Sequence, residues 1–249
     1  MVNTDGNAPV LVVVGGSRGI GAAIATAAAQ AGFAVLLSYA NDAARGEAMA
    51  EAIRNGGGIA RAIRADTAKL ADIEALLAAA DELGPLRAMV YNAGVTGGSS
   101  TLVDADPGLV ARVIEVNLTG AILCSRAAVA RMSTATGGSG GAIVLLSSRA
   151  TAYGSAGEHV WYAASKGGID ALAVGLAREA GPMGVRVNVV SPGPIDTGML
   201  GEQKKIRAAG LVPLQRIGTP EEVAAAVMFL VSPEASFISG ANLAVSGGR

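Results

Sequence analysis

Apolar residues are distributed along this chain in two distinct patterns. Short apolar runs rich in β-branched residues predict strands at residues 10–14, 34–38, 59–65, 88–91, 142–147, 185–190 and 242–245. Longer alanine-rich segments with helical spacing lie between them and predict helices near residues 19–31, 42–55, 68–83, 105–135, 162–181 and 220–231. The strand segments are nearly continuous apolar runs, which indicates that helices cover both faces of a parallel sheet.

The strict alternation of these segments predicts the fold class. Seven strands and six helices in this order are typical of an α/β protein with a doubly wound, Rossmann-type sheet that is mostly parallel. No linker or repeat divides residues 1–249, so we expect a single domain. The segment 195–216 has no clean pattern and follows a strand end, where ligands bind in such sheets. We therefore expect it to act as a mobile substrate lid.

Composition excludes several classes of function. The chain has 19 Lys+Arg and 20 Asp+Glu with no basic stretch, so no nucleic-acid partner is expected. The single cysteine, Cys124, excludes a disulfide within the chain and a cysteine-based zinc site, and the single histidine, His159, makes a histidine-rich metal site equally unexpected. Glycine is the one residue in excess, with 35 of 249 residues. That is roughly twice its usual share of about 7%.

The lengths of the apolar runs predict the cellular location of the protein. The longest early apolar run, 10–14, is shorter than the roughly 7 residues that a signal sequence needs, and Gly15-Gly16 ends it. No run approaches the roughly 18 apolar residues of a membrane span. We expect a cytoplasmic protein that does not associate with membranes.

A glycine-rich loop follows the first predicted strand. The chain reads Gly15-Gly16-Ser17-Arg18-Gly19-Ile20-Gly21 and then enters a helix. Glycines allow a tight turn and let backbone N–H groups approach a pyrophosphate at the helix N-terminus. The spacing is G-x-x-x-G-x-G rather than G-x-G-x-x-G, so an ordinary tight turn is the alternative interpretation.

The end of the second strand indicates which dinucleotide would bind. An NAD site usually carries Asp or Glu there, but this chain reads Tyr39-Ala40-Asn41 with no carboxylate before Asp42. Arg18 can donate a charge-assisted hydrogen bond to a 2′-phosphate, which favours NADP. Alternatively, Arg18 is a solvated loop charge and Asp42 rotates inward.

Tyr162 and Lys166 open a predicted helix with a spacing of four residues. This spacing places the phenol and the ammonium on one helix face. A nearby ammonium is expected to lower the pKa of Tyr162 from its usual value near 10 and make proton exchange efficient. Ser147-Ser148 ends the preceding strand, where a hydroxyl can donate to a substrate carbonyl oxygen.

These motifs resemble the classical short-chain dehydrogenase/reductase family over nearly the whole chain, and the Tyr39-Ala40-Asn41 run resembles its NADP-linked members. The resemblance implies catalytic roles for Ser148, Tyr162, Lys166 and Asn117, the last to anchor a water that connects Lys166 to solvent. It implies cofactor contacts from Gly15, Ser17, Arg18, Gly19, Ile20, Gly21, Tyr39, Ala40, Asn41, Asp66, Thr67, Asn92, Ala93, Gly94, Tyr162, Lys166, Pro192, Gly193, Ile195 and Thr197.

Three positions depart from the family pattern. Val14 stands where Thr is usual before the glycine loop, and Ser246 stands where Asp is common near the end. The spacing from Ser148 to Tyr162 is 14 residues rather than the common 13, which keeps Ser147 as an alternative to Ser148 for the catalytic serine.

The resemblance implies reversible hydride transfer between NADP(H) and a carbonyl or alcohol of a small molecule, in a homotetramer. Candidate substrate-facing residues are Arg149, Tyr153, His159, Trp161 and the segment 195–216. His159 is either an auxiliary proton carrier or a loop residue that shapes the pocket. The alternatives for the whole protein are an NAD-dependent dehydrogenase, an epimerase or dehydratase of the same fold, and a dinucleotide sensor without turnover.

Overall fold

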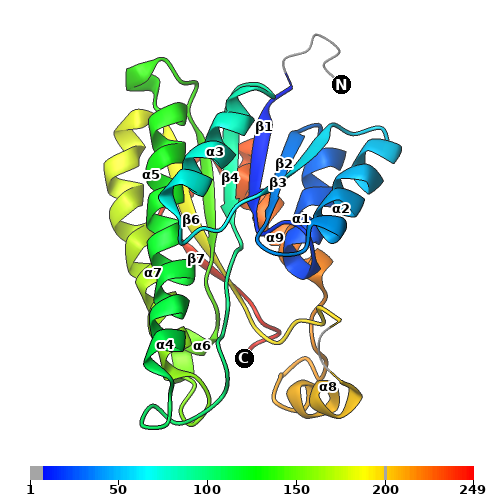
Figure 1. Cartoon of the computed structure of the whole chain (residues 1–249), viewed down its shortest axis with the longest axis vertical. Coiled ribbons are helices and arrows are strands. Elements are labelled where there is room, and N and C mark those ends of the chain that lie inside the picture. The colour runs from blue at the N-terminus through cyan, green and yellow to red at the C-terminus, as the bar shows by residue number, and fades with distance from the viewer. Residues whose placement is uncertain (1–7, 199–200) are drawn as a thin grey trace.

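Seven parallel strands form one sheet in the computed structural model, which describes residues 8–198 and 201–249 (Figure 1). Their order is β3-β2-β1-β4-β5-β6-β7. The strands are β1 Val10–Val14, β2 Ala34–Tyr39, β3 Ala60–Arg64, β4 Leu86–Tyr91, β5 Gly141–Leu146, β6 Val185–Pro192 and β7 Asn242–Val245. Every strand pair is parallel. The predicted doubly wound Rossmann fold is therefore confirmed.

Helices cover both faces of this sheet. They are α1 Gly19–Gln30, α2 Ala43–Asn55, α3 Leu70–Asp81, α4 Pro107–Ile114, α5 Gly120–Met132, α6 Ala150–Tyr153, α7 Val160–Ala180, α8 Glu202–Ala209 and α9 Pro220–Val231. Helices α3, α5 and α7 share one core with the sheet, and α1, α2 and α9 share the other. Successive residues of β1 alternate between the two cores, which explains why its sequence is apolar throughout.

The strand predictions agree with the structure to within two residues at each end. Two helices were not predicted: the short α6 after β5, and α8 inside the segment 195–216. The predicted helix near 105–135 exists as α4 and α5, joined by one turn of wider π-helix, η1 Glu115–Thr119.

One helical stretch among the described residues, Pro107–Met132, is long and apolar enough to cross a membrane by length and composition. This corrects the expectation that no segment would meet that test. Its apolar side chains are used in the protein core, because Ala121, Cys124, Ala128 and Met132 of α5 are buried in the cluster shared with β4. Packing on the sheet therefore accounts for the apolar residues on the inner face of this helix, and 44% of its most apolar window is buried.

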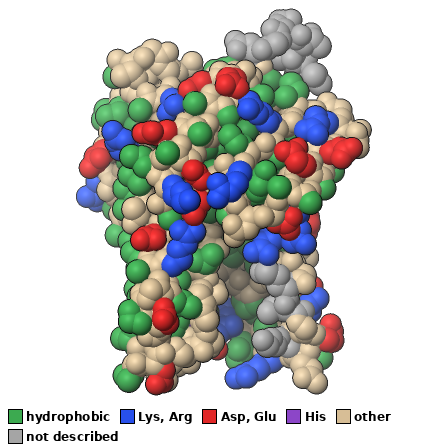
Figure 2. Space-filling view, in the orientation of Figure 1, with side chains coloured by type: hydrophobic (Ala, Val, Ile, Leu, Met, Phe, Trp, Pro, Cys, Tyr) green, Lys and Arg blue, Asp and Glu red, His purple; other side chains and the backbone are tan. Residues whose placement is uncertain are grey.

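The carboxyl ends of the strands point toward the lower end of the molecule in Figure 1, where α4 and α6 lie on one side and α8 on the other. Figure 2 shows a hollow between two lobes at this end, with acidic and basic side chains mixed on the surface above it. Ligands of doubly wound sheets bind at this edge.

Candidate active site

A pocket of about 650 Å³ lies at the carboxyl edge of the sheet. It is lined by the glycine loop and by the segments that follow β2, β3, β4, β5 and β6. All the residues expected to contact cofactor or substrate oxygen line it except Gly21 and Asn117. Residues from six parts of the sequence therefore converge on one cavity.

The glycine loop is held by hydrogen bonds to its own backbone. The N–H of Gly15 donates to Ser38 Oγ at 3.0 Å, and Asn92 Nδ2 donates to the Gly15 carbonyl oxygen at 2.7 Å. A Cβ on Gly21 would overlap that carbonyl oxygen and approach Asn92 Nδ2 to 2.6 Å. Gly21 therefore lets α1 pack under the loop, which explains why it is needed although it does not line the pocket.

The N-terminus of α1 opens onto the pocket at Gly19 and Ile20. Arg18 occupies the N-cap position, and its side chain makes no capping hydrogen bond. No acidic residue lies in the first turn. Free N–H groups and the helix dipole make such a terminus a binding site for a phosphate group.

The carboxylate that follows β2 is used to cap a helix. Asp42 lines the rim, but its side chain caps α2 by accepting the N–H of Arg45 at 3.0 Å. The Arg45 guanidinium also lies 3.5 Å from the same carboxylate. The alternative in which Asp42 rotates inward would break the cap and this ion pair. Arg18, which lines the same end of the pocket, is exposed.

Asp66, which follows β3, and Arg112 of α4 both line this pocket and form an ion pair. Arg112 Nη2 lies 2.8 Å from Asp66 Oδ1, and the N–H of Ala68 donates to the same oxygen at 3.1 Å. Burial acts to raise the pKa of Asp66, but these two hydrogen bonds, together with the positive charges of Arg112 and Lys69, hold its pKa below the usual value. Thr67, beside it, accepts a hydrogen bond from the buried Tyr91 hydroxyl, with 3.0 Å between the two oxygens.

Asn117 lies in the π-helical turn η1, and its side-chain amide makes three hydrogen bonds. Oδ1 accepts the Val95 N–H at 2.8 Å, while Nδ2 donates to the Val95 carbonyl at 2.9 Å and to Ser165 Oγ at 3.0 Å. The side chain therefore locks the loop after β4, which includes Asn92, Ala93 and Gly94. A π turn within a helix is frequent at functional sites.

The two adjacent serines after β5 have different surroundings. Ser147 is buried and donates to the Lys166 carbonyl at 3.1 Å, so its hydroxyl ties β5 to α7. Ser148 accepts the Ala150 N–H at 3.1 Å and interacts with Tyr162, whose pKa it lowers. This geometry favours Ser148 over Ser147 as the hydroxyl available to a substrate.

Tyr162 and Lys166 lie on the inner face of α7 and both line the pocket. Burial raises the pKa of Tyr162 overall, with Ser148 opposing the change, which is opposite to the lowering expected from Lys166. Lys166 Nζ lies 5.9 Å from the centre of the Tyr162 ring and donates to the Leu146 carbonyl at 2.7 Å. Lys166 is 3% exposed, and burial lowers its pKa to about 8.

The segment after β6 completes the wall of the pocket. Pro192, Gly193, Ile195 and Thr197 line it. The Gly193 N–H donates to the Val245 carbonyl at 2.9 Å, and Ile195 forms an isolated bridge with Gly218. The first part of the segment 195–216 is therefore anchored to the protein body.

The four candidate substrate-facing residues do not line this pocket. Trp161 is buried, and its Nε1 donates to the Thr96 carbonyl at 2.9 Å. Arg149 Nε donates to the Arg249 carbonyl at 2.7 Å, and the guanidinium of Arg249 lies over the Tyr153 ring. His159 meets the Tyr162 ring edge-to-face at 5.4 Å between centres.

Sequence reasoning missed several residues of the pocket wall. They are Ser38, Ala65, Val95, Thr96, Arg112, Val116 and Leu146. Arg112 and Val116 are one helical turn apart, so a shared helix face was the signal that could have found them.

Comparison with known proteins agrees with this architecture. The family model for enoyl-(acyl carrier protein) reductase matches residues 14–249. The chain is 41% identical to the uncharacterised oxidoreductase YgfF of Escherichia coli K12, across 96% of this chain and 99% of that protein. It is also 41% identical to cis-4-hydroxycyclohexanecarboxylate dehydrogenase of Sinomonas cyclohexanicum, across 96% and 95%.

A solved short-chain dehydrogenase/reductase from Serratia marcescens superposes with a TM-score of 0.90 and is 36% identical. The match covers 97% of this chain and 98% of that one. The ordered motifs, the parallel sheet and these likenesses extend over almost the whole sequence. The chain belongs to the short-chain dehydrogenase/reductase family of oxidoreductases.

Proposed function

We propose that this protein transfers a hydride between NADP(H) and the carbonyl or secondary-alcohol carbon of a small molecule. One observation carries the proposal: Ser148, Tyr162 and Lys166 share a single pocket with the glycine loop. A proton donor, a hydroxyl and a buried cation thus lie next to a phosphate-binding helix end. A protein that only senses a dinucleotide needs neither the proton donor, Tyr162, nor the substrate-facing hydroxyl of Ser148.

The residues present fit a dinucleotide. The N-terminus of α1 has no side-chain cap and can hold the pyrophosphate through the N–H groups of Gly19 and Ile20. Gly94 has no Cβ, and one built there would meet both Lys166 Nζ and Asn117 Oδ1 at 3.4 Å. The remaining cofactor contacts are those expected from the sequence: Gly15, Ser17, Arg18, Tyr39, Ala40, Asn41, Asp66, Thr67, Asn92, Ala93, Pro192, Gly193, Ile195 and Thr197.

Tyr162 is the proton donor for carbonyl reduction and the acceptor for alcohol oxidation in this mechanism. The nicotinamide supplies or takes the hydride, which no protein side chain can do. Because burial raises the pKa of Tyr162, its phenol is protonated at neutral pH and ready to donate. Ser148 is placed to orient the substrate oxygen and to stabilise the charge that develops on it.

Lys166 has two roles in this scheme. Its Nζ uses one hydrogen bond on the Leu146 carbonyl, so two N–H groups are left for a ribose. Its positive charge favours the phenolate of Tyr162 once the proton has left. Asn117 is a positioning residue, because its side chain holds the Val95 backbone. If Asn117 also anchors a water, it does so through atoms other than those bonded to Val95.

Arg18 supports NADP over NAD. It lines the pocket near Ala40 and Asn41, where no carboxylate competes, since Asp42 is committed to capping α2. A 2′-phosphate would gain a charge-assisted hydrogen bond from this guanidinium.

The segment 195–216 is proposed as the substrate lid of a single domain spanning 1–249. Within it an ion pair joins α8 to the start of the segment, because Lys205 Nζ lies 2.6 Å from Asp196 Oδ2. Ile206, Leu211 and Leu214 are exposed apolar residues of this segment, and they are available to cover an apolar substrate. The relative whose name gives a hydroxycyclohexane substrate supports a secondary alcohol as the reacting group.

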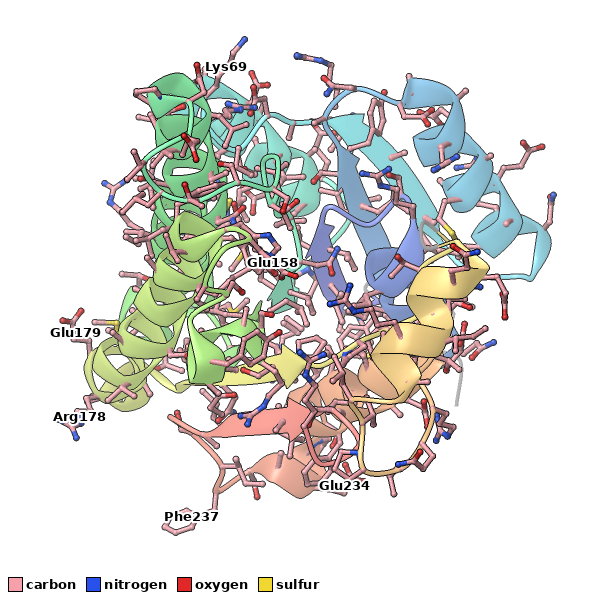
Figure 3. All side chains as sticks on the ribbon, turned by 90° about the horizontal axis from the view of Figure 1, so that it is seen from below. Lys69, Glu158, Arg178, Glu179, Glu234 and Phe237 are labelled. Atoms are coloured by element: carbon pink, nitrogen blue, oxygen red, sulfur yellow. The ribbon has the colours of Figure 1, made fainter. Side chains whose placement is uncertain are left out.

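We propose a cytoplasmic homotetramer. The edge strand β7 exposes Leu243, α7 exposes Val174, and Phe237 points away from the body of the molecule and is fully exposed (Figure 3). Open strand edges and apolar side chains of this kind favour association with another copy. Light scattering at micromolar concentration is expected to give four chains per particle, and a monomer would contradict this.

Net cofactor oxidation tests the proposed activity. The purified protein is mixed with NADPH or NADH and a panel of ketones, sugars, steroids and acyl thioesters. We expect consumption of NADPH with at least one carbonyl class and a higher kcat/KM than with NADH. An epimerase or dehydratase would convert substrate without net consumption, and a sensor would bind NADPH without turnover.

A further inference from the structure

The ion pair between Asp66 and Arg112 connects two parts of the chain that are 46 residues apart. Asp66 follows β3, while Arg112 lies near the end of α4, and both line the pocket. Arg112 Nη2 lies 2.8 Å from Asp66 Oδ1. Nothing in the resemblance assigns a role to Arg112.

Asp66 is held from three sides. Its backbone N–H donates to Asp72 Oδ2 at 2.9 Å, and its Oδ1 accepts both the Ala68 N–H and Arg112. Within the described part of the chain, both side-chain hydrogen bonds fall on Oδ1, which leaves Oδ2 for a donor from a ligand. The side chain is only 16% exposed, so a group that binds it is largely shielded from water.

The chemistry of this carboxylate decides which group it accepts. Arg112 and Ala68 together hold the pKa of Asp66 below the usual value despite burial, so the group is an acceptor only. A carboxylate accepts hydrogen bonds from an amino group and repels a carbonyl oxygen. With the pyrophosphate at the N-terminus of α1 and the nicotinamide beside Tyr162, the adenosine end of the dinucleotide would lie on the side of β2 and β3. The amino group offered to Asp66 is then that of the 6-aminopurine.

A second exposed ion pair of the protein provides a comparison. Arg61 Nη1 lies 2.6 Å from Glu82 Oε2, and its side chain is 46% exposed, as is that of Arg112. Its carboxylate is 67% exposed and neither residue lines the pocket. Exposed ion pairs contribute little to stability, so loss of either arginine should leave the fold intact.

We infer that Arg112 is a positioning residue that holds the Asp66 carboxylate for the 6-amino group of the cofactor's adenine. The inference rests on the proposed function, in that it takes the bound molecule to be a nicotinamide adenine dinucleotide. Arg112 fixes the rotamer and the charge of Asp66, and the pair selects adenine over hypoxanthine.

Direct binding measurements test this role. NADPH and its hypoxanthine analogue, in which a carbonyl replaces the amino group, are titrated by reduced-nicotinamide fluorescence without substrate. We expect the wild-type protein to bind NADPH about tenfold more tightly than the analogue, as for a hydrogen bond to a charged group. Arg112→Met is expected to weaken NADPH binding about fivefold and to bring the ratio of the two Kd values within about twofold.

Two further variants control the measurement. Arg61→Met should keep both Kd values at the wild-type level, and Arg112→Lys should give an intermediate ratio, because a lysine keeps the charge without the planar fork. The thermal unfolding midpoint of each variant checks the fold. An unchanged ratio in Arg112→Met, equal binding of both dinucleotides by the wild type, or the same loss in Arg61→Met overturns the role of Arg112.

The binding measurements and the activity measurements test the role of Arg112 and the proposed activity separately. The binding ratio needs no turnover, so a protein that discriminates the two bases yet reduces no carbonyl contradicts only the activity. A protein that reduces carbonyls with an unchanged ratio in Arg112→Met contradicts only the role of Arg112.

Discussion

The two halves of the pocket present different chemical groups to a ligand. The nucleotide half, made of the glycine loop and the segments after β2 and β3, presents backbone N–H groups and exposed side chains such as Arg18. The catalytic half, made of the segments after β4 and β5 and the start of α7, presents side chains. In it Asn117, Ser147, Ser165 and Lys166 are buried and hydrogen-bonded.

This difference separates two kinds of constraint. In the nucleotide half, the shape of the backbone matters most, and glycine is required where a Cβ would collide. In the catalytic half, polar groups are removed from water, so each needs a partner and its proton affinity shifts. Substitutions in the nucleotide half should therefore act mainly through steric collision with the backbone. Substitutions in the catalytic half should act mainly through lost hydrogen bonds and changed pKa values.

The largest effect is expected from Tyr162→Phe in the catalytic half. Removing the hydroxyl deletes the proposed proton donor, which typically contributes about 10²–10⁴-fold to a rate. We expect kcat to fall by that factor while the Kd for NADPH and the unfolding midpoint stay near wild type. Turnover like that of the wild type would remove Tyr162 from the mechanism.

The neighbouring serines give a matched control for this substitution. Ser148→Ala should lower kcat without a change in stability. Ser147→Ala should instead lower the free energy of unfolding by about 1 kcal/mol, because its hydroxyl bonds the Lys166 carbonyl. The reverse result would identify Ser147 as the catalytic serine.

Gly21→Ala is the corresponding test of the nucleotide half. The added Cβ would collide with the Gly15 carbonyl oxygen, so α1 or the loop must shift. We expect the free energy of unfolding to fall by about 1–3 kcal/mol, as in overpacked cores, and the Kd for NADPH to rise. In Gly181→Ala the new Cβ meets open space, and both quantities should be nearly unchanged.

Lys166→Met should separate stability from activity. Because burial lowers the pKa of Lys166 from 10.5 to about 8, the folded protein holds this proton less tightly than the unfolded chain. Wild-type stability therefore rises as pH increases from about 8 to 10.5, and the buried charge costs up to ~3 kcal/mol at lower pH. The Met variant lacks this cost, although it leaves the Leu146 carbonyl without its donor.

We expect Lys166→Met to lower kcat by less than Tyr162→Phe does and to be more stable than wild type at pH 7, by about 1–2 kcal/mol after loss of that hydrogen bond. Chemical denaturation at pH 7 and pH 10.5 measures the difference, which should shrink at the higher pH. Lys69→Met, at an exposed lysine, is the control and should show no such trend (Figure 3). A constant difference would show that burial of the charge is not the cause.

The smallest effect is expected from Arg18→Ala, which removes one exposed charge from the nucleotide half. One charge-assisted hydrogen bond to a 2′-phosphate corresponds to about tenfold in kcat/KM for NADPH. The value for NADH should not change. Equal losses with both cofactors would contradict the NADP preference.

Sequence reasoning predicted the fold well, because its main signal is local. Continuous apolar runs such as 10–14 belong to strands buried on both faces, and their length and order determine the sheet. The motifs predicted which residues meet in the pocket, since parallel strands bring their carboxyl ends to one edge.

The remaining features depend on contacts between distant residues. Trp161 and Arg149 were expected near the substrate, but each is paired with a distant backbone carbonyl, of Thr96 and Arg249 respectively. The shift in the pKa of Tyr162 was predicted with the wrong sign, because burial raises this pKa and the hydrogen bond with Ser148 opposes it only in part. Side-chain burial depends on the whole fold and leaves little trace in local spacing.

The π turn Glu115–Thr119 fixes how the two halves of the pocket are rotated relative to one another about the helix axis. The continuous helical stretch carries Arg112 before this turn and Asn117 within it, so a single backbone sets the angle between these two side chains and hence between the two halves of the pocket. One residue more or fewer between them would rotate one end by about 100° relative to the other. Insertions and deletions are therefore far less tolerable here than in the surface loops, even though the turn itself touches little of the pocket.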